Sequence, residues 1–333
     1  MEGTAEGGKL DLWDRRILYE LDCDARAPFS AIGRKVKRSP QWVKYRVERL
    51  RRLGAIKHLY PVIDYSRLGY FLAGMWLKLA NASPAEEGAF LNACYKESAI
   101  QMVYRAEGEY DLFLGAFAPN LASLEEFILR FKEAHGAIVS SLDSSLVTSN
   151  CKFSRHYLLG GKAGDGEGAK VGSACEVAKA DREDLLIIGC LNADPRMGAV
   201  EMARRTGMGK DAVLYRLRRL AKDKVLRGCT LQVNFRNLPV QSYTILLRTA
   251  GMNDEKRAEL ESFCRLSGKA VRLSSSLGSY DFMIELEAES RDSCRWFHKE
   301  LCRRFSKNLR GSSMQYIYSL DKHRLFPTET GGK

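Results

Sequence analysis

The chain of 333 residues is longer than one ordinary domain, and its apolar share of 45% is high enough to build more than one core. Its formal charge of +12 permits a polyanionic partner without identifying one. The 9 cysteines form no C-x-x-C pair, so neither a disulfide framework nor a zinc ribbon is expected. No segment resembles a signal peptide or a transmembrane helix, so a cytoplasmic protein is expected.

Three short helices are predicted near the start of the chain. Apolar residues recur at helical spacing over 12–21, and a second short helix is expected over 29–36. The third lies in "SPQWVKYRVERLRRLG", where Ser39 is the N-cap, a proline takes the first helical position and Gly54 follows the last turn. Because a tight turn separates the last two helices, residues 10–58 are predicted to form a helix-turn-helix domain.

Strand-like and helical segments then alternate. Strands are expected at 71–80, 100–106, 110–117 and 137–148, and helices near 84–97 and 123–135. The order β-α-β-β-α-β is the ferredoxin-like plan, which is therefore predicted over 59–158. Residues 159–179 are rich in Gly, Ala and charge, and are predicted to form a flexible linker.

The sequence then repeats itself at a constant offset of 170 positions. The matches include Tyr45, Arg46, Arg49 and Leu50, which fall on Tyr215, Arg216, Arg219 and Leu220. A second helix-turn-helix domain is predicted over 180–228 and a second ferredoxin-like domain over 229–327. The predicted fold class is α+β, with two tandem units, each a winged helix-turn-helix followed by a ferredoxin-like βαββαβ domain.

Basic charge is concentrated on the two predicted helix-turn-helix segments. Residues 30–58 hold ten bases against one acid, and residues 200–230 hold nine against three. This is the pattern expected of a protein that reads duplex DNA, although a solvated basic helix face is the alternative. The candidate DNA contacts are Ser39, Gln41, Trp42, Lys44, Tyr45, Arg46 and Arg49 on the first recognition helix, and Lys210, Tyr215, Arg216 and Arg219 on the second.

The second recognition helix is not a copy of the first. Asp211 stands where the first helix has Gln41, and Leu214 stands where it has Lys44. Fewer cations and one carboxylate weaken its attraction to phosphates, so the two halves are expected to bind DNA unequally or to read different half-sites.

No catalytic residue, cofactor or metal site is predicted. The five histidines, at 58, 135, 156, 298 and 323, are scattered without metal-ligand spacing, so surface or capping roles are expected. A repeated G-x-Y-D turn contains Asp111 and Asp281, but neither has a second acid at useful spacing. Each turn is expected at the tip of the central hairpin of its ferredoxin-like domain, where a leading glycine suits a type II′ turn.

A helix-turn-helix followed by "YPVIDYSRLGY" and by a ferredoxin-like domain with a G-x-Y-D hairpin resembles the Lrp/AsnC, or feast/famine, family of prokaryotic transcription regulators. The resemblance covers residues 10–158 and again 181–327. The second copy departs from the pattern, with Asn234 and Pro239 where the first has Asp64 and Gly69.

The resemblance implies a regulator that binds double-stranded DNA, pairs through its sheets and responds to a small effector, typically an amino acid. The effector-side positions it implies are Gly108, Tyr110, Asp111, Gly278, Tyr280 and Asp281. The residues alone allow a structural role instead, with the glycine serving the turn, the tyrosine packing in the sheet and the aspartate capping a backbone amide. A tandem form suggests an intramolecular pseudo-dimer at the nucleoid, with larger homo-oligomers also open.

Two other interpretations remain. Sirohaem decarboxylases are similar in build and bind a tetrapyrrole rather than DNA, although the hairpin motif and the basic recognition helices favour a regulator. Alternatively, the second half has become a sensing or pairing module that no longer contacts DNA.

Overall fold

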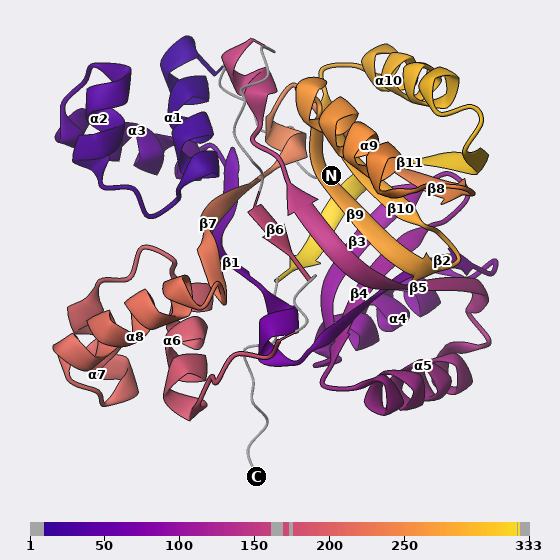
Figure 1. Ribbon diagram of the computed structural model, residues 1–333, viewed down its shortest axis with the longest axis horizontal. Helices are drawn as coiled ribbons and strands as arrows, with labels where there is room; N and C mark the ends of the chain where they lie inside the picture. The colour runs from indigo at the N-terminus through magenta and orange to yellow at the C-terminus, as the bar shows by residue number, and fades with distance from the viewer. Residues whose placement is uncertain (1–9, 161–168, 173–175, 325, 327–333) are drawn as a thin grey trace.

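The computed structural model describes residues 10–160, 169–172, 176–324 and 326. It has the predicted α+β fold in two tandem units. In Figure 1 the two helix-turn-helix domains lie on the left, one above the other, and the ferredoxin-like domains with their helices lie on the right.

Each helix-turn-helix domain has three helices in the predicted order. They are α1 (Leu12–Cys23), α2 (Phe29–Val36) and α3 (Pro40–Arg52) in the first unit, and α6 (Arg182–Ala193), α7 (Ala199–Thr206) and α8 (Lys210–Lys222) in the second. As predicted, Ser39 caps α3 by accepting a hydrogen bond from the backbone N–H of Trp42 at 3.2 Å, with Pro40 at the first position. Val43, Val47 and Leu50 face the core.

A two-stranded sheet that the sequence analysis did not predict joins the two halves. Strand β1 (Ile56–Ile63) pairs antiparallel with β7 (Leu226–Val233), with Leu59 opposite Leu231. The helix-turn-helix domains pack across this pair. The core of α1–α3 includes Leu231 from the other unit, and α6–α8 share a core with Tyr60 and Val62 of β1. Each helix-turn-helix domain is therefore completed by a strand from the opposite half.

The ferredoxin-like domains have the predicted element order. The first contains β2 (Phe71–Leu79), α4 (Pro84–Lys96), β3 (Ile100–Glu107), β4 (Leu112–Ala118), α5 (Leu121–His135) and β5 (Val139–Lys152). The second contains β8 (Gln241–Thr249), α9 (Asp254–Leu266), β9 (Ala270–Gly278), β10 (Phe282–Ala288), α10 (Arg291–Arg304) and β11 (Leu309–His323). Short 3-10 helices, η1 (Tyr65–Leu68), η2 (His156–Leu159) and η3 (Phe235–Asn237), lie in connecting segments.

The two four-stranded sheets pair along both of their edges. The strand order is β5-β2-β4-β3 in the first half and β11-β8-β10-β9 in the second, with β3 paired to β11 and β9 paired to β5. The combined sheet therefore closes on itself, and α4, α5, α9 and α10 cover its outer side (Figure 1). An unpaired edge exposes free N–H and C=O groups, so each half satisfies the edges of the other.

Strand β2 is buried on both faces along most of its length. On the outer face of the first sheet, Met75 and Leu114 pack with Phe90 of α4 and Phe131 of α5. On the inner face, alternate residues such as Trp76 join a core that also contains residues of the second half. Because the pleat sends successive side chains to opposite faces, burial on both explains the nearly continuous apolar run of "FLAGMWLKLA".

The segment predicted as a flexible linker over 159–179 is partly structured. Strand β6 (Ala169–Val171) extends the sheet by pairing with the end of β5, and the Gly172 N–H donates to the Asp64 carboxylate at 2.9 Å. The composition of this segment predicted coil because it is poor in large residues. Strand β2 pairs with β5 only as far as Val147, so the backbone of residues 150–152 is available to pair with β6 and orders it. The "GKAGDGEG" part of the prediction lies outside the described residues.

A buried cluster of charges joins the first helix-turn-helix domain to the second ferredoxin-like domain. The Arg155 guanidinium donates two hydrogen bonds to the Glu287 carboxylate, at 2.8 and 2.9 Å, and one to Asp22 at 2.5 Å. Lys152 forms a second ion pair with Asp22 at 3.0 Å. Asp22 and Glu287 are each 1% exposed, so both charges depend on their partners.

This cluster predicts a specific loss of stability in acid. Burial alone would raise the pKa of Asp22, but the charges of Lys152 and Arg155 outweigh it and lower the pKa to about 2 from 3.8. A depressed folded-state pKa stabilises the protein above the unfolded pKa, and this contribution is lost as the pH falls through the folded value. Between pH 5 and pH 2 we expect the unfolding free energy of the wild type to fall by about 2 kcal/mol more than that of Asp22→Asn, measured by urea denaturation. Equal pH dependence of the two proteins would contradict this assignment.

Candidate nucleic-acid interface

The exposed faces of α3 and α8 contain part of the predicted DNA contacts. Gln41, Lys44 and Tyr45 are exposed on α3, and Lys210 and Tyr215 are exposed on α8. The two tyrosines occupy matching positions of the repeat and are 57% and 63% exposed. Because a large aromatic side chain is this exposed on both helices, each helix offers a surface to which a partner can bind.

The predicted contacts Arg46 and Arg49 bind carboxylates of α1. Arg46 contacts Asp14 at 3.1 Å and Asp11 at 2.6 Å, and Arg49 contacts Asp14 at 2.7 Å. The Asp14 side chain is fully buried, so the two guanidinium groups compensate its charge and fix the recognition helix to α1.

The second unit repeats this arrangement. Arg216 contacts Asp181 at 2.7 Å and Asp184 at 3.0 Å, and Arg219 also pairs with Asp184, whose side chain is fully buried. The arginines that align in the repeat therefore share one structural role. Their contribution to DNA binding stays a prediction, since each helix also presents exposed groups.

Trp42, another predicted contact, is half-buried among charged and aromatic groups. Its ring lies edge-on to Trp13 at 6.2 Å between centroids, and the guanidinium of Arg46 lies 4.8 Å from the ring. Such cation–π contacts contribute about 0.5–1 kcal/mol each at partly exposed sites. Trp42 thus supports the position of Arg46 in the first unit.

Two arginines, 170 positions apart, connect the helix-turn-helix domains reciprocally. Arg196 donates to the carbonyl oxygens of Ala25 and Ala27 at 2.6 and 3.0 Å. Arg26 donates to the equivalent carbonyls of Pro195 and Met197. This two-fold exchange, together with the β1–β7 pair, holds the two domains in one relative orientation.

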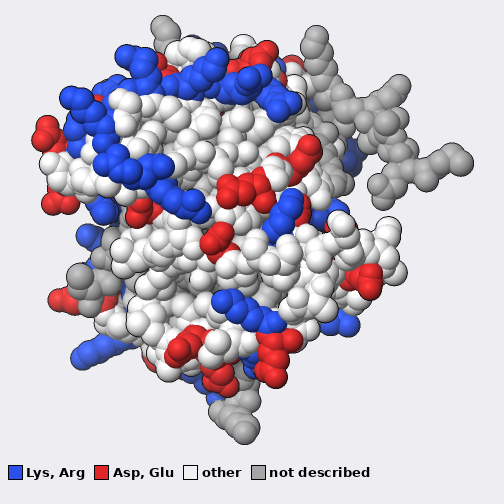
Figure 2. All heavy atoms as spheres, turned by 90° about the vertical axis from the view of Figure 1, so that its right-hand side faces the viewer, with Lys and Arg blue, Asp and Glu red and all other residues white. Residues whose placement is uncertain are grey.

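Basic side chains are not confined to the helix-turn-helix side of the molecule. Figure 2 shows the face away from these domains, with Lys and Arg side chains gathered along its upper part, on the side of α9 and α10. Helix α10 contributes five bases in 14 residues, Arg291, Arg295, Lys299, Arg303 and Arg304. The exposed recognition helices, and not the net charge, therefore define the candidate interface.

The two G-x-Y-D turns contact one another through their tyrosines. The hydroxyls of Tyr110 and Tyr280 are 2.5 Å apart, and Tyr110 also donates to Asp143. Both tyrosines are buried, and burial together with the bond to Asp143 raises the pKa of Tyr110. Gly108 and Gly278 have φ of +149° and +139°, where a side chain would be strained.

The aspartates of these turns accept hydrogen bonds from neighbouring backbone. Asp111 accepts from the Leu79 N–H at 2.8 Å and pairs with Lys78 at 2.8 Å, and Asp281 accepts from the Thr249 N–H at 2.6 Å. All six predicted effector-side residues thus have structural surroundings that account for their type. Effector binding by them stays a prediction.

Two histidines, for which surface or capping roles were expected, lie side by side at a cavity. His323 is only 6% exposed, and its ring centroid is 5.8 Å from that of His58. The sequence analysis missed them because neither has metal-ligand spacing. The available signal was a departure from the repeat, since Gly228 and Phe153 occupy the matching positions of the other half.

Comparisons with known proteins identify the family. A model of the AsnC-type helix-turn-helix domain matches residues 10–51 and 181–221. An uncharacterised HTH-type transcriptional regulator of Pyrococcus furiosus is 35% identical over 124 residues, which is 37% of this chain and 80% of the relative. The HTH-type transcriptional regulator LrpC of Bacillus subtilis is 30% identical over 142 residues, 43% of this chain and 97% of the relative.

Among solved structures, the siroheme decarboxylase NirDL matches 95% of this chain and 94% of its own with a TM-score of 0.62 at 15% identity, which shows a common tandem fold. No helix among the described residues is long and apolar enough to span a membrane. With two matches to the AsnC-type domain and relatives aligned over most of their length, the chain belongs to the Lrp/AsnC family of helix-turn-helix transcription regulators.

Proposed function

We propose that this protein is a sequence-specific DNA-binding transcription regulator that contacts two half-sites with α3 and α8 and acts in the cytoplasm at the nucleoid. The observation that carries the proposal is the pair of exposed tyrosines, Tyr45 and Tyr215, on recognition helices whose domains are joined by Arg26 and Arg196. A free recognition helix in a fixed orientation is what major-groove reading requires.

On α3 the exposed side chains suit different parts of a duplex. Gln41, near the N-terminal end of α3, has the donor and acceptor needed for bidentate contact with adenine. Lys44 suits a phosphate, and Tyr45 offers both an aromatic face and a hydroxyl. On α8, Asp211 replaces the glutamine, so we propose that the second half reads a different base sequence or binds more weakly.

Within one chain the two halves act as a pseudo-dimer. Binding of the first half-site holds the second domain at a high local concentration. Two half-sites about 10 base pairs apart, or a multiple of this distance, would then be occupied together. Selection of bound DNA from a random pool, in about 0.15 M salt, tests this. Enrichment of two motifs at fixed spacing is expected, and a pool without any enriched sequence would contradict the proposal.

Regulation by a small effector, such as an amino acid, is part of the same proposal. Family membership and the contact between the two G-x-Y-D turns support it, because a ligand near Asp111 or Asp281 would lie at the junction of the halves. The same selection repeated with amino acids should change the affinity or the preferred spacing for one of them. Unchanged DNA binding with every amino acid would remove this part alone.

The contacts of Arg26 and Arg196 lead to a prediction about how strongly DNA affinity depends on the spacing between the two half-sites. Replacing both Arg26 and Arg196 by alanine removes four donor contacts between the domains. Adding half a helical turn between the half-sites should weaken wild-type binding about tenfold, and the double variant much less. Retardation assays on the two DNAs measure this. Arg303→Ala, an exposed arginine on α10, is the control and should behave as the wild type.

An enzyme related to the siroheme decarboxylases is the second candidate. It is favoured by the cavity beside His58 and His323, together with the likeness of the whole chain to NirDL in fold. Two histidines at one cavity provide possible proton-transfer groups. The two candidates give opposite results. A Soret band that shifts when sirohaem is added, without retardation of any selected DNA, would favour the enzyme over the regulator.

A further inference from the structure

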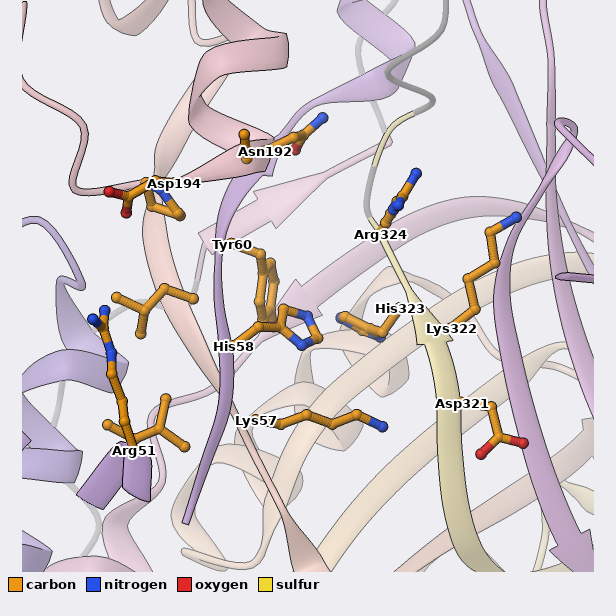
Figure 3. Close-up of a pocket in the computed structure, with 14 residues that line it drawn as sticks. Arg51, Lys57, His58, Tyr60, Asn192, Asp194, Asp321, Lys322, His323 and Arg324 are labelled. Atoms are coloured by element: carbon orange, nitrogen blue, oxygen red, sulfur yellow. The ribbon is translucent and has the colours of Figure 1, made fainter. Parts of the chain in front are cut away.

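A cavity lies at the junction of both helix-turn-helix domains with the closed sheet. It has a volume of about 690 Å³. Its walls come from the end of α3, from β1, from the loop after α6 and from the end of β11. Figure 3 shows residues of these four segments around one space, with His58 and His323 side by side at its centre. This volume is within the range of small-molecule sites.

Three buried nitrogens lining this cavity have no hydrogen-bond partner among the described residues. They are Nε2 of His58, Nε2 of His323 and Nδ2 of Asn192. The other ring nitrogen of His323 contacts the Tyr104 hydroxyl at 2.5 Å. When that hydroxyl donates to Nδ1, the neutral ring carries its proton on Nε2, which is then a buried donor beside the cavity. Buried polar groups without partners are costly, so these three nitrogens leave hydrogen-bonding capacity beside the cavity that a ligand or water would satisfy.

The groups around these nitrogens give the cavity a positive charge. Arg51, Lys57, Lys322 and Arg324 line it, against Asp194 and Asp321. Asp321 is already paired with Arg105 at 2.8 Å, and Asp194 accepts from the Arg196 N–H at 2.9 Å. Lys57 donates to the Leu320 carbonyl, and Lys322 donates to the carbonyls of Tyr95 and Glu97 at 3.1 Å. The lining therefore holds four cationic groups against two acids.

The histidines do not add to this charge at neutral pH. Burial first, and then the charge of Lys57, lower the pKa of His58 to about 4. Burial and the charge of Arg272 lower the pKa of His323 well below its ordinary value. Both rings are thus neutral and can serve as hydrogen-bonding groups beside the cations.

The location that corresponds to this cavity in the other half of the repeat is occupied by buried side chains. The cavity residues Tyr60, Asn192 and Lys322 correspond, 170 positions apart, to Thr230, Asp22 and Lys152. Those three belong to the buried ion cluster with Arg155, in which Thr230 donates to the Asp22 backbone carbonyl at 2.7 Å. At the location around Asp22, the ion pairs with Lys152 and Arg155 fill the space. At the matching location around Asn192, cationic side chains and buried donors surround the cavity.

We propose that the cavity binds a small organic or inorganic anion that carries at least two carboxylate or phosphate groups. Cations at the mouth and neutral donors inside are the arrangement that such an anion requires. The site is separate from the G-x-Y-D turns. Because Arg51 lies in the last turn of α3 and Asn192 lies near the end of α6, a bound anion contacts both DNA-binding domains, and its binding is coupled to that of DNA.

Calorimetric titration of the free full-length protein with citrate, and separately with pyrophosphate, tests the site without DNA. We expect one site for at least one of the two probes, and the one that binds tells whether carboxylate or phosphate is preferred. Lys57→Ala and Arg324→Ala should each weaken binding about tenfold to a hundredfold, because each removes a charge-assisted contact. The duplication supplies a matched control, since Arg227 occupies the position of Lys57 in the closed half, and Arg227→Ala should leave the affinity unchanged.

Three results would overturn the proposal. The first is no heat of binding with either probe at about 10 mM, well above the millimolar range of weak ligands. The second is that Arg227→Ala and Lys57→Ala weaken binding of the anion equally, which would show that the anion responds to the overall charge of the protein and not to this cavity. The third is unchanged affinity in both cavity variants. None of these bears on DNA binding, which the selection experiment measures independently.

Discussion

Arg155→Met is expected to lower the free energy of unfolding by about 3–5 kcal/mol, the usual cost of removing one partner from a buried ion pair. Arg155 is 4% exposed and donates to both Asp22 and Glu287. Methionine fills a similar volume but leaves Glu287 with only the hydroxyl of Tyr157, at 2.6 Å. Lys152 remains beside Asp22 and partly compensates it. Urea denaturation followed by far-UV circular dichroism measures the loss.

Two further variants separate the buried cluster from charge loss in general. Arg204→Met removes an arginine whose side chain is 73% exposed and pairs with Glu201, and it should change the stability by less than about 1 kcal/mol. Combining Arg155→Met with Asp22→Asn and Glu287→Gln removes the uncompensated charges and should recover part of the loss. If Arg155→Met were as mild as Arg204→Met, the cluster would not stabilise the junction between the halves.

The location of this cluster explains why the duplicated halves differ. It joins α1 of the first unit to β10 of the second through Arg155, which follows β5. In the other half, Asn192 replaces the aspartate and Phe117 replaces Glu287, so the same ion pairs cannot form. One junction is thus closed by charges, and the other keeps the cavity.

Local patterns predicted the elements well because local chemistry determines them. The Ser-Pro start of α3 satisfies free backbone donors at a helix end, and helical spacing of Val43, Val47 and Leu50 places them on one buried face. The order of strands and helices predicted the ferredoxin-like plan. The constant repeat offset predicted two copies of it.

Contacts between distant segments could not be predicted in the same way. Pairing of β3 with β11 and of β5 with β9 depends on which sheet edges meet, and edge pairing leaves no periodic signal in either strand. Likewise, the spacing of Arg46 and Arg49 indicated an exposed basic face, whereas their partner Asp14 lies more than 30 residues away. The sequence alone does not distinguish an arginine that binds a buried carboxylate from an arginine that is available to bind a DNA phosphate.

The DNA-binding test is therefore best made at exposed residues that bind no buried carboxylate. Tyr45→Ala should weaken binding to a selected DNA by about 5- to 150-fold, equivalent to about 1–3 kcal/mol for one specific contact. Stability should hardly change, because the side chain is 57% exposed. Lys44→Ala should reduce the slope of log affinity against log salt by about one unit. Titration by fluorescence anisotropy at several salt concentrations measures both effects.

The matching residue of the second helix decides whether both halves read DNA. If α8 lies in a groove, Tyr215→Ala also weakens binding, and its effect combines with that of Tyr45→Ala to remove most of the avidity of the linked domains. If the second half serves only for pairing, Tyr215→Ala has no effect, although the residue is 63% exposed. Trp296→Ala is the control, because Trp296 is 61% exposed on α10, away from both recognition helices. Equal weakening by Trp296→Ala would show that DNA binds to another face of the molecule. If only Tyr45→Ala weakens binding, the first unit alone contacts DNA and the second unit serves to position it.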